Sequence, residues 1–326
     1  MPTRRRALLL LALLALLAGV SLLWALMAGT LPVAPRDALG ALLGQDQGTA
    51  GEVVRSLRLP RALAAFACGG LLAVAGALMQ VLLRNPLADP YVLGISGGAG
   101  VGALFAILFG WAVVGINFLA FLGALGATFL VFGLARGDGS WTQTRLLLTG
   151  VIVASGCGAF VTLLLAVAPE HKVQGMLYWL MGDLSQVLDP KPALVILVLA
   201  VAGVLPFARE LNLLARGLAT AQSLGVAVPR LRRLIYFVAA LATATAVTTA
   251  GAIGFVGLVV PHLTRLAVGN DQRLLIPASA LGGGALLTLA DTLARTVVAP
   301  EQLPVGVLTA LLGVPVFLFL LSRRPR

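Results

Sequence analysis

Long stretches without a charged residue alternate with short polar segments along the whole chain. There are eight such stretches, at residues 7–35, 62–83, 90–135, 146–169, 192–208, 234–264, 274–290 and 302–322. About 20 consecutive apolar residues form a helix long enough to cross the roughly 30 Å hydrocarbon core of a bilayer. Each stretch therefore predicts one or two transmembrane helices.

Two of the stretches are too long for a single crossing. Residues 90–135 contain a break between Gly110 and Asn117, which predicts two helices joined by a turn. Residues 234–264 predict a full helix and then a short broken one, because their second half contains Gly251, Gly254, Gly257 and Pro261. Irregular backbone at membrane depth is tolerated where it packs against protein. The pattern predicts an all-α polytopic membrane protein of about ten helices, nine full and one broken.

The composition supports a membrane location for the whole chain. Hydrophobic residues make up 60% and charged residues 11% of the 326 residues, and the mean hydropathy is +1.02. Soluble domains contain about 25% charged residues. We therefore expect residues 1–326 to form a single transmembrane domain. The first apolar run, residues 7–28, is longer than the roughly 7–15 residues of a signal peptide core, so it is interpreted as a retained helix.

The basic residues indicate an orientation. With ten crossings, 16 of the 23 arginines and lysines fall on the side that also holds both ends of the chain. Cytoplasmic loops of membrane proteins carry an excess of basic residues, so both termini are expected in the cytoplasm. This bias explains the net charge of +11. Membrane lipid is the expected surrounding, and no nucleic-acid partner is expected.

The predicted helices contain no midplane charge that would couple transport to an ion gradient. Asp291 and Arg295 lie four residues apart near one helix end and are expected to pair there. The sequence has no G-x-x-x-x-G-K-[ST] loop, so any ATP that drives transport must bind to another chain. Cys68 and Cys157 are isolated within predicted helices. No catalytic residue, metal site or cofactor is expected in this chain.

One short motif leaves an enzymatic alternative open. Residues 94–98 match G-x-S-x-G and resemble in part the serine motif of rhomboid intramembrane proteases, with Ser96 as nucleophile and His262 as candidate base. The glycines also suit close helix packing, because they recur every four residues at 94, 98 and 102. Packing is the favoured interpretation, since nothing in the sequence places His262 at the depth of Ser96.

A weak internal repeat accompanies the glycine pattern. A shift of 175 residues aligns residues 75–78 with 250–253 and Pro86 with Pro261. In the topology above, the two copies run in opposite directions through the membrane. A true repeat would therefore be of the inverted type found in many transporters. Chance similarity in a chain rich in alanine and glycine is an equal alternative.

Several motifs resemble those of one transporter family. They lie at residues 57–61, 75–80, 85–90, 177–182, 251–262 and 303–306. In this order they are similar to the FecCD-type permeases of ABC importers for iron-siderophores, haem and vitamin B12. The resemblance implies ten helices, both termini in the cytoplasm, and two chains around a central pathway. A homodimer is the expected arrangement.

The same resemblance implies partners, a location and a cargo. The partners are an ABC ATPase subunit in two copies and a periplasmic substrate-binding protein. The location is the bacterial inner membrane. The cargo is an iron chelate (haem or siderophore), with cobalamin as the alternative. ATP binds to the partner subunit in such importers, so the resemblance implies no cofactor for this chain.

The polar segment at about 209–233 is the candidate contact with the ATPase. Its pattern predicts an amphipathic helix near 213–224 and a turn at Gly225, on the cytoplasmic side. Resemblance to the family's coupling helix assigns ATPase contact to Gly217, Ala221, Leu224 and Gly225. Arg216 and Leu218 depart from the residue types that are usual there. A solvated loop is the alternative.

Three arginines match a docking set in the family. Arg58, Arg61 and Arg295 correspond to arginines that in the vitamin B12 permease receive glutamates of the binding protein. Guanidinium groups at an exposed rim would steer and hold carboxylates. This role is favoured for Arg58 and Arg295 and less for Arg61, which is expected to lie deeper. Snorkelling at helix ends is the alternative.

Four residues match the family's cytoplasmic gate region: Asn85, Leu87, Thr142 and Gln143. Uncharged side chains at a narrow part of the pathway suit a transporter that must pass a bulky cargo without binding it tightly. Turn and cap roles are the alternative, since asparagine before proline is a common turn. His262 at the helix break is interpreted as a structural hydrogen-bonding residue.

Overall fold

The computed structural model describes residues 4–45, 48–135, 142–187 and 189–322, which form a bundle of helices without a strand in these ranges. Seven helices within them are long and apolar enough to cross a membrane. They are α1 (Arg4–Met27), α4 (Leu59–Leu82), α6 (Val113–Ala135), α7 (Gln143–Val167), α9 (Lys191–Val204), α12 (Val228–Ala250) and α14 (Gln272–Ala294). α9 reaches this length because it continues through η3 (Leu205–Phe207) into α10 (Ala208–Arg216).

Three shorter apolar helices complete the bundle: α5 (Ile95–Leu108), α13 (Val256–Val268) and α15 (Val305–Ser322). The prediction of an all-α membrane protein with about ten apolar helices is confirmed for the described residues. The prediction that nine of them are full length is wrong, because α5 has only 14 residues. The stretch at 90–135 also supplies the short helix η2 (Pro90–Leu93) and two turns, which shortens α5.

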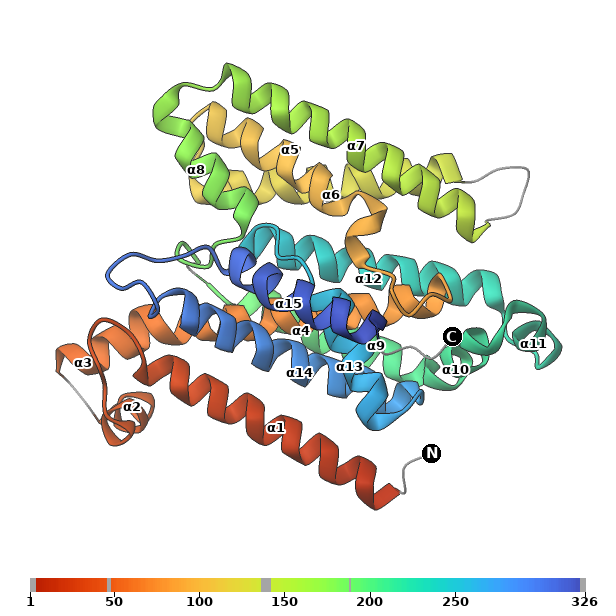
Figure 1. Ribbon diagram of the computed structural model, residues 1–326, viewed down its shortest axis with the longest axis horizontal. Helices are drawn as coiled ribbons and strands as arrows, with labels where there is room; N and C mark the ends of the chain where they lie inside the picture. The colour runs from red at the N-terminus through yellow and green to blue at the C-terminus, as the bar shows by residue number, and fades with distance from the viewer. Residues whose placement is uncertain (1–3, 46–47, 136–141, 188, 323–326) are drawn as a thin grey trace.

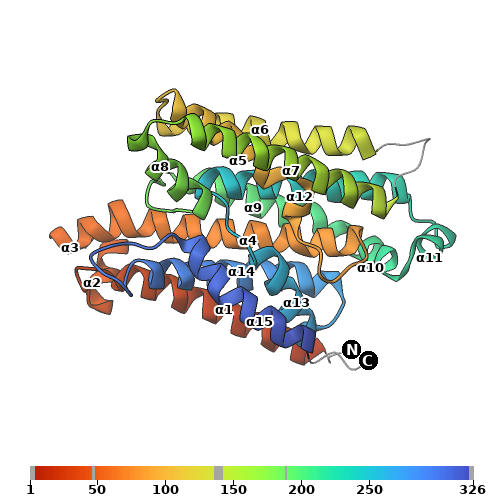
Figure 2. The same cartoon turned by 45° about the horizontal axis from the view of Figure 1, so that its top comes forward.

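Short helices lie at both ends of the bundle (Figure 1). One end, here called the α3 end, carries α2 (Pro35–Leu42), α3 (Thr49–Glu52), η1 (Val53–Arg58) and α8 (Glu170–Met181). The opposite end, called the α11 end, carries α10 and α11 (Leu218–Ser223). The start of α1 and the end of α15 also lie toward the α11 end (Figure 2). The long helices therefore run alternately between the two ends.

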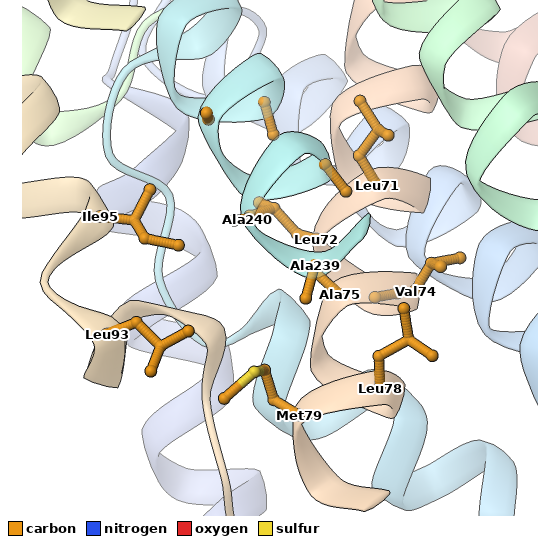
Figure 3. Packing of buried hydrophobic residues seen from close by; sticks show 14 of the residues in the cluster. Leu71, Leu72, Val74, Ala75, Leu78, Met79, Leu93, Ile95, Ala239 and Ala240 are labelled. Atoms are coloured by element: carbon orange, nitrogen blue, oxygen red, sulfur yellow. The ribbon is translucent and has the colours of Figure 1, made fainter. Parts of the chain in front are cut away.

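α4 is the centre of the bundle. It packs against α9, α12, α13 and α14 and is buried along nearly its whole length. Small residues permit this approach, because backbone carbonyls of α14 and α13 occupy the positions that side chains on Gly69 and Gly76 would need. Figure 3 shows aliphatic side chains of α4 and α12 filling the remaining space. Close backbone packing of this kind is typical of membrane helices.

α5, α6, α7 and α8 form a second group of helices beside this core (Figure 1). α12 makes the main connection between the group and the core. The Tyr236 hydroxyl of α12 donates to the Thr128 carbonyl of α6 at 2.8 Å, and the rings of Phe132 and Tyr236 lie 4.9 Å apart. These contacts fix the group to the core in the half of α12 that is nearer the α11 end.

The chain between α12 and α13 is irregular, as its glycines predict. Gly251 and Phe255 have positive φ angles of +71° and +69°. Groups from other segments pair with the backbone there: the Ile253 N–H donates to the Tyr91 hydroxyl at 3.0 Å, and the Asp183 N–H donates to the Ala250 carbonyl at 2.9 Å. The expectation of irregular backbone packed against protein is confirmed for residues 251–255. The expectation that the short helix itself is broken is wrong, because α13 continues through Gly257 and Pro261.

The internal repeat does not align equivalent positions. Gly76 lies inside α4, whereas Gly251, its partner at a shift of 175 residues, follows the last residue of α12. The alignment matches residue types and not backbone conformation. A coarser likeness exists, because the long α4 is followed by the short α5 and the long α12 by the short α13. An inverted repeat stays a prediction.

Candidate functional site

A buried ion pair joins the start of α4 to the last turn of α14 at the α3 end. Arg61 Nη2 lies 2.8 Å from Asp291 Oδ1, and Arg61 Nε lies 3.0 Å from both carboxylate oxygens. The side chain of Asp291 is 2% exposed and that of Arg61 is 12% exposed. Arg61 Nη1 also donates to Gln302 Oε1 at 2.6 Å, in the exposed loop before α15. The forked contact holds the Arg61 guanidinium in one orientation.

Two further arginines beside this pair hold the end of α1. Arg58 Nη1 donates to the Leu26 and Met27 carbonyls at 2.8 and 3.0 Å, and Arg295 donates to the Ala25 carbonyl. The last carbonyls of a helix lack partners within it and carry the negative end of its dipole. Arg58 and Arg295 therefore neutralise the end of α1 and fasten it to α4 and α14.

These arginines lie differently from the expectation. Arg58 and Arg295 are only 5% and 8% exposed, so an exposed rim position is wrong for both, because the α1 carbonyls hold their guanidinium groups inside. Arg61, expected to lie deeper, keeps a contact with the exposed Gln302. The expected pair of Asp291 and Arg295 is present at 3.7 Å, but Arg61 is the closer partner. Docking at this arginine cluster stays a prediction.

The segment at 209–233 contains two short helices where one was expected at 213–224. α10 ends at Arg216, and α11 follows after Gly217, whose φ is +135°. Residues other than glycine rarely adopt this backbone conformation, so Gly217 is the reason for the break. The expected turn at Gly225 is confirmed by its φ of +81°.

α10 is fixed to the bundle by the side-chain amide of one asparagine, which both donates and accepts a hydrogen bond. Asn212 donates to Asp271 Oδ1 and accepts from the Gln272 N–H, both at 2.9 Å, at the start of α14. Leu211 and Leu214 bury the apolar side of α10. A displacement of α10 would therefore act directly on α14.

α11 extends beyond the bundle (Figure 1). Ala221 is buried on its inner side, whereas the Leu224 side chain after its last turn is 61% exposed. Gly217 and Gly225 bound the helix at both ends. Of the four predicted contact residues, Leu224 is the one that presents a large apolar side chain to a partner.

The predicted gate residues lie where α4 ends and α7 begins. The Gln143 side chain accepts from Arg84 Nη2 at 3.1 Å and donates to the Leu82 carbonyl at 3.3 Å. One glutamine thus joins the first turn of α7 to the last turn of α4. No sequence pattern predicts this contact, because the residues are about 60 positions apart.

Asn85 and Thr142 have local structural roles. Asn85 Oδ1 accepts from the Leu87 N–H at 3.0 Å, which stabilises the turn after α4. Thr142 Oγ1 accepts from the Arg145 N–H at 3.3 Å and caps α7. These geometries match the turn and cap alternative for the two residues. A gate role for the set stays a prediction.

Asp89 contributes to the same region, although it is not among the predicted gate residues. Its Oδ1 accepts from the Tyr91 N–H at 2.7 Å and caps η2. Burial raises the pKa of the Asp89 carboxyl to about 6, and the Tyr91 N–H opposes the shift. The sequence signal was the pair Asp89-Pro90, because aspartate is a favoured N-cap and proline a favoured first residue of a helix.

The glycines around Ser96 have packing roles. Gly98 and Gly102 of α5 lie directly against backbone carbonyls of α6, as the packing interpretation predicts. Gly94 differs from this pattern, because it forms the left-handed turn between η2 and α5 with a φ of +72°. Ser96 lies in the first turn of α5, and His262 lies on α13.

Comparison with protein families identifies the family of the chain. The model of the FecCD transport family matches residues 13–323. The chain belongs to the FecCD transport family. The resemblance of its motifs to this family is therefore confirmed. The match gives no support to the protease alternative at Ser96 and His262.

Named relatives of this FecCD chain are permeases. It is 47% identical over 279 residues to the cobalamin import system permease protein BtuC of Halobacterium salinarum, covering 85% of this chain and 75% of the relative. It is 42% identical over 278 residues to the hemin transport system permease protein HmuU of Yersinia pestis, covering 82% of this chain and 83% of the relative.

A solved structure has the same arrangement of helices as this FecCD chain. It is described as an inward-facing conformation of a metal-chelate type ABC transporter. The TM-score is 0.86 at 31% sequence identity, and the match covers 96% of this chain and 99% of the other. The likeness includes both the core around α4 and the group of α5 to α8.

Proposed function

We propose that this chain is the permease subunit of an ABC importer that moves an iron chelate (haem or siderophore) or cobalamin from the periplasm to the cytoplasm. The match to the FecCD family over residues 13–323 carries the proposal. The cobalamin and hemin transport named for two relatives supports this class of cargo. Uptake of each chelate into proteoliposomes that contain the assembled importer tests the proposal and identifies the cargo.

A separate ATPase powers this transport. The sequence lacks a phosphate-binding loop of its own. Two ATPase subunits, one for each permease chain, contact the segment that contains Gly217, Ala221, Leu224 and Gly225. The exposed Leu224 supports this contact, because an apolar side chain on a short helix is a common anchor in a partner's groove. The permease itself performs no covalent chemistry.

The α11 end and both termini face the cytoplasm, and the α3 end faces the periplasm, in the bacterial inner membrane. The positive-inside bias supports this orientation, because the α11 end carries Arg209, Arg216, Arg230, Arg232 and Arg233. The α3 end carries fewer basic residues, and acidic residues such as Glu52 and Glu170 lie among them.

The periplasmic binding protein docks at the arginine cluster of the α3 end. Arg61 and Arg295 pair with one carboxylate, that of Asp291. Arg58 donates to carbonyls of α1, so the cluster has three cationic groups and one carboxylate and carries an excess of positive charge. Arg61 is its accessible member, through the contact with Gln302. Excess positive charge attracts a partner that presents carboxylates and speeds their encounter.

Two copies of the chain form the pathway as a homodimer with twofold symmetry, the commonest arrangement of identical subunits. Asn85, Leu87, Thr142 and Gln143 narrow the pathway near the cytoplasm. The contact of Gln143 with the Leu82 carbonyl supports a concerted movement, since it ties α7 to α4 at that end.

A further inference from the structure

A large cavity lies on the line where the second helix group meets the core. Its volume is about 1120 Å³. The walls come from the end of α5, from the start of α6, from α8 and the loop after it, from the start of α9 and from the last turns of α12. All these segments lie at the α3 end (Figure 1). None of the arginine, coupling or gate residues discussed above lines it.

The depth of the cavity matches one leaflet of a bilayer. Along α12 the lining extends from Gly251, just past the helix end, inward to Leu241. Ten residues of helix span about 15 Å. This is about half of the roughly 30 Å hydrocarbon core. The lining therefore follows α12 over about half the thickness of a bilayer's hydrocarbon core.

The lining changes from polar to apolar along this depth. His171, Gln174, Asp183 and Ser185 line the mouth, on α8 and the loop that follows it. Phe121, Ile196 and Leu241 line the part that lies inside the helical spans. A molecule that fills the cavity must therefore have a polar end and an apolar body.

The hydroxyl groups of two threonines in the apolar part are already hydrogen-bonded within α12. Thr248 Oγ1 donates to the Ala244 carbonyl at 2.9 Å, and Thr249 Oγ1 donates to the Thr245 carbonyl at 2.8 Å. Both donors are already used within α12, so these two hydroxyl groups need no polar partner from a ligand.

The edge of the cavity is open to the hydrocarbon of the membrane. Val114 and Phe118 of α6 form part of the lining, and their side chains are 73% and 59% exposed. A chain from the surrounding bilayer can therefore reach the cavity sideways between the helices. It need not enter from the water on either side.

The charges at the mouth favour one class of polar group. Asp183 and Asp189 are part of the lining, and no arginine or lysine is, among the residues that the structure describes. Carboxylates pair with an ammonium group, and Ser185 holds the Asp183 carboxylate in place through its N–H and its hydroxyl. The mouth therefore suits a headgroup that carries an amine.

We propose that this cavity binds a zwitterionic phospholipid, with one acyl chain along α12 and its ammonium group near Asp183 and Asp189. In the orientation of the proposed function the lipid belongs to the periplasmic leaflet. The lipid lies between the second helix group and the core at the α3 end, whereas the Tyr236 contact joins the two parts nearer the α11 end. The lipid therefore acts as a spacer that fixes the distance between the two parts at the α3 end.

Matched glycine variants test the site. Gly175 lines the cavity and Gly203 on α9 does not, and a Cβ atom on either would meet no atom within 4 Å. The probe is phosphatidylethanolamine, counted per chain by native mass spectrometry on the complex released from membranes. We expect Gly175→Leu to lower the occupancy at least tenfold and Gly203→Leu to leave it at the wild-type level. Equal occupancy in both variants would overturn the proposal.

A second pair keeps the test informative if Gly175→Leu does not fold. Ile196→Trp fills the cavity from α9, whereas Val198→Trp lies on the exposed side of the same helix. Only the first is expected to lose the lipid. Displacement of the lipid by haem or cobalamin would assign the cavity to the cargo instead. A disulfide between two copies through Phe118→Cys would assign it to a second copy of the chain. Lipid counting needs neither ATP nor cargo, so its outcome is independent of the transport assay.

Discussion

At the scale of single residues, the α3 end shows how several buried charges are accommodated together. Arg58 and Arg295 donate to the carbonyls at the end of α1, and Arg61 holds Asp291 in a forked contact. A buried charge is costly unless it is paired and hydrogen-bonded. Each of these groups has such partners, so the cluster joins α1, α4 and α14 at one point.

The ion pair of Arg61 and Asp291 is expected to matter for stability. Asp291→Asn removes the only carboxylate of the pair and leaves two buried guanidinium groups without a counter-charge, which we expect to cost about 3 kcal/mol. The thermal midpoint of the purified complex measures this. Gln302→Ala removes only the exposed contact of Arg61 and is the control, expected to change stability by less than about 1 kcal/mol. Equal midpoints for the two variants would refute the structural role of the pair.

Gln302 also allows docking to be tested without breaking the buried pair. Gln302→Glu places a carboxylate against the accessible face of Arg61, where it competes with carboxylates of the binding protein. We expect roughly tenfold weaker binding of that protein, measured by calorimetry with the assembled importer. Gln45→Glu adds the same charge to an exposed position at the same end and should bind like the wild type. Unchanged affinity for Gln302→Glu would argue against docking at Arg61.

The positions of the residues in the arginine cluster could be predicted from the sequence only in part. Motif resemblance pointed to Arg58, Arg61 and Arg295, and a spacing of four residues pointed to Asp291 and Arg295. The closer partner of Asp291 lies 230 positions away in sequence, so no local pattern indicates it. The burial of Arg58 and Arg295 could not be predicted either, because the carbonyls that bind their guanidinium groups belong to another helix, α1.

At the scale of elements, the break between α12 and α13 is a rigid junction. Gly251 combines a φ of +71° with close contact to the Trp179 carbonyl. Gly251→Ala would strain the backbone and collide with that carbonyl, and we expect a loss of about 2 kcal/mol or more. Gly254→Ala is the matched control, since Gly254 has open space around it. Thermal midpoints of the two variants should differ by several degrees. The same midpoint in both would mean that the junction tolerates a side chain at Gly251.

In the proposed function, α11 is the element that contacts the ATPase. Leu224→Glu replaces the exposed apolar anchor by a charge, so we expect the ATPase stimulation by loaded binding protein to fall at least roughly tenfold in the assembled complex. Ser223→Glu places the same charge one residue earlier, at an exposed polar position, and should retain stimulation. Full stimulation in Leu224→Glu would exclude Leu224 from the coupling contact.

The long helices were predictable because charge-free stretches of the right length directly reflect the thickness of the membrane. The break after α12 was predictable from its glycines. The helices α2 and α8 were not, since they are short and contain no long apolar run. Gly217 was the available signal for the break between α10 and α11, but a single glycine does not reveal whether a helix bends or ends there.

At the scale of the whole molecule, two helix groups share one principal connection through α12. The core around α4 is held by close backbone contacts, whereas the group of α5 to α8 meets it at Tyr236 and leaves a cavity at the α3 end. We propose that the pathway opens alternately to the two sides of the membrane through a movement of one group against the other. α10 is fastened to the start of α14, so a displacement of α10 by a bound ATPase would act directly on the core.

The most direct test of the proposed function is transport itself. Proteoliposomes with this chain, its ATPase and its binding protein are given radiolabelled cobalamin, haem or a ferric siderophore, with ATP or a non-hydrolysable analogue inside. We predict ATP-dependent accumulation of one of these chelates, abolished by Leu224→Glu and retained by Ser223→Glu. The absence of ATP-dependent uptake of every chelate from an intact assembled complex would contradict the account.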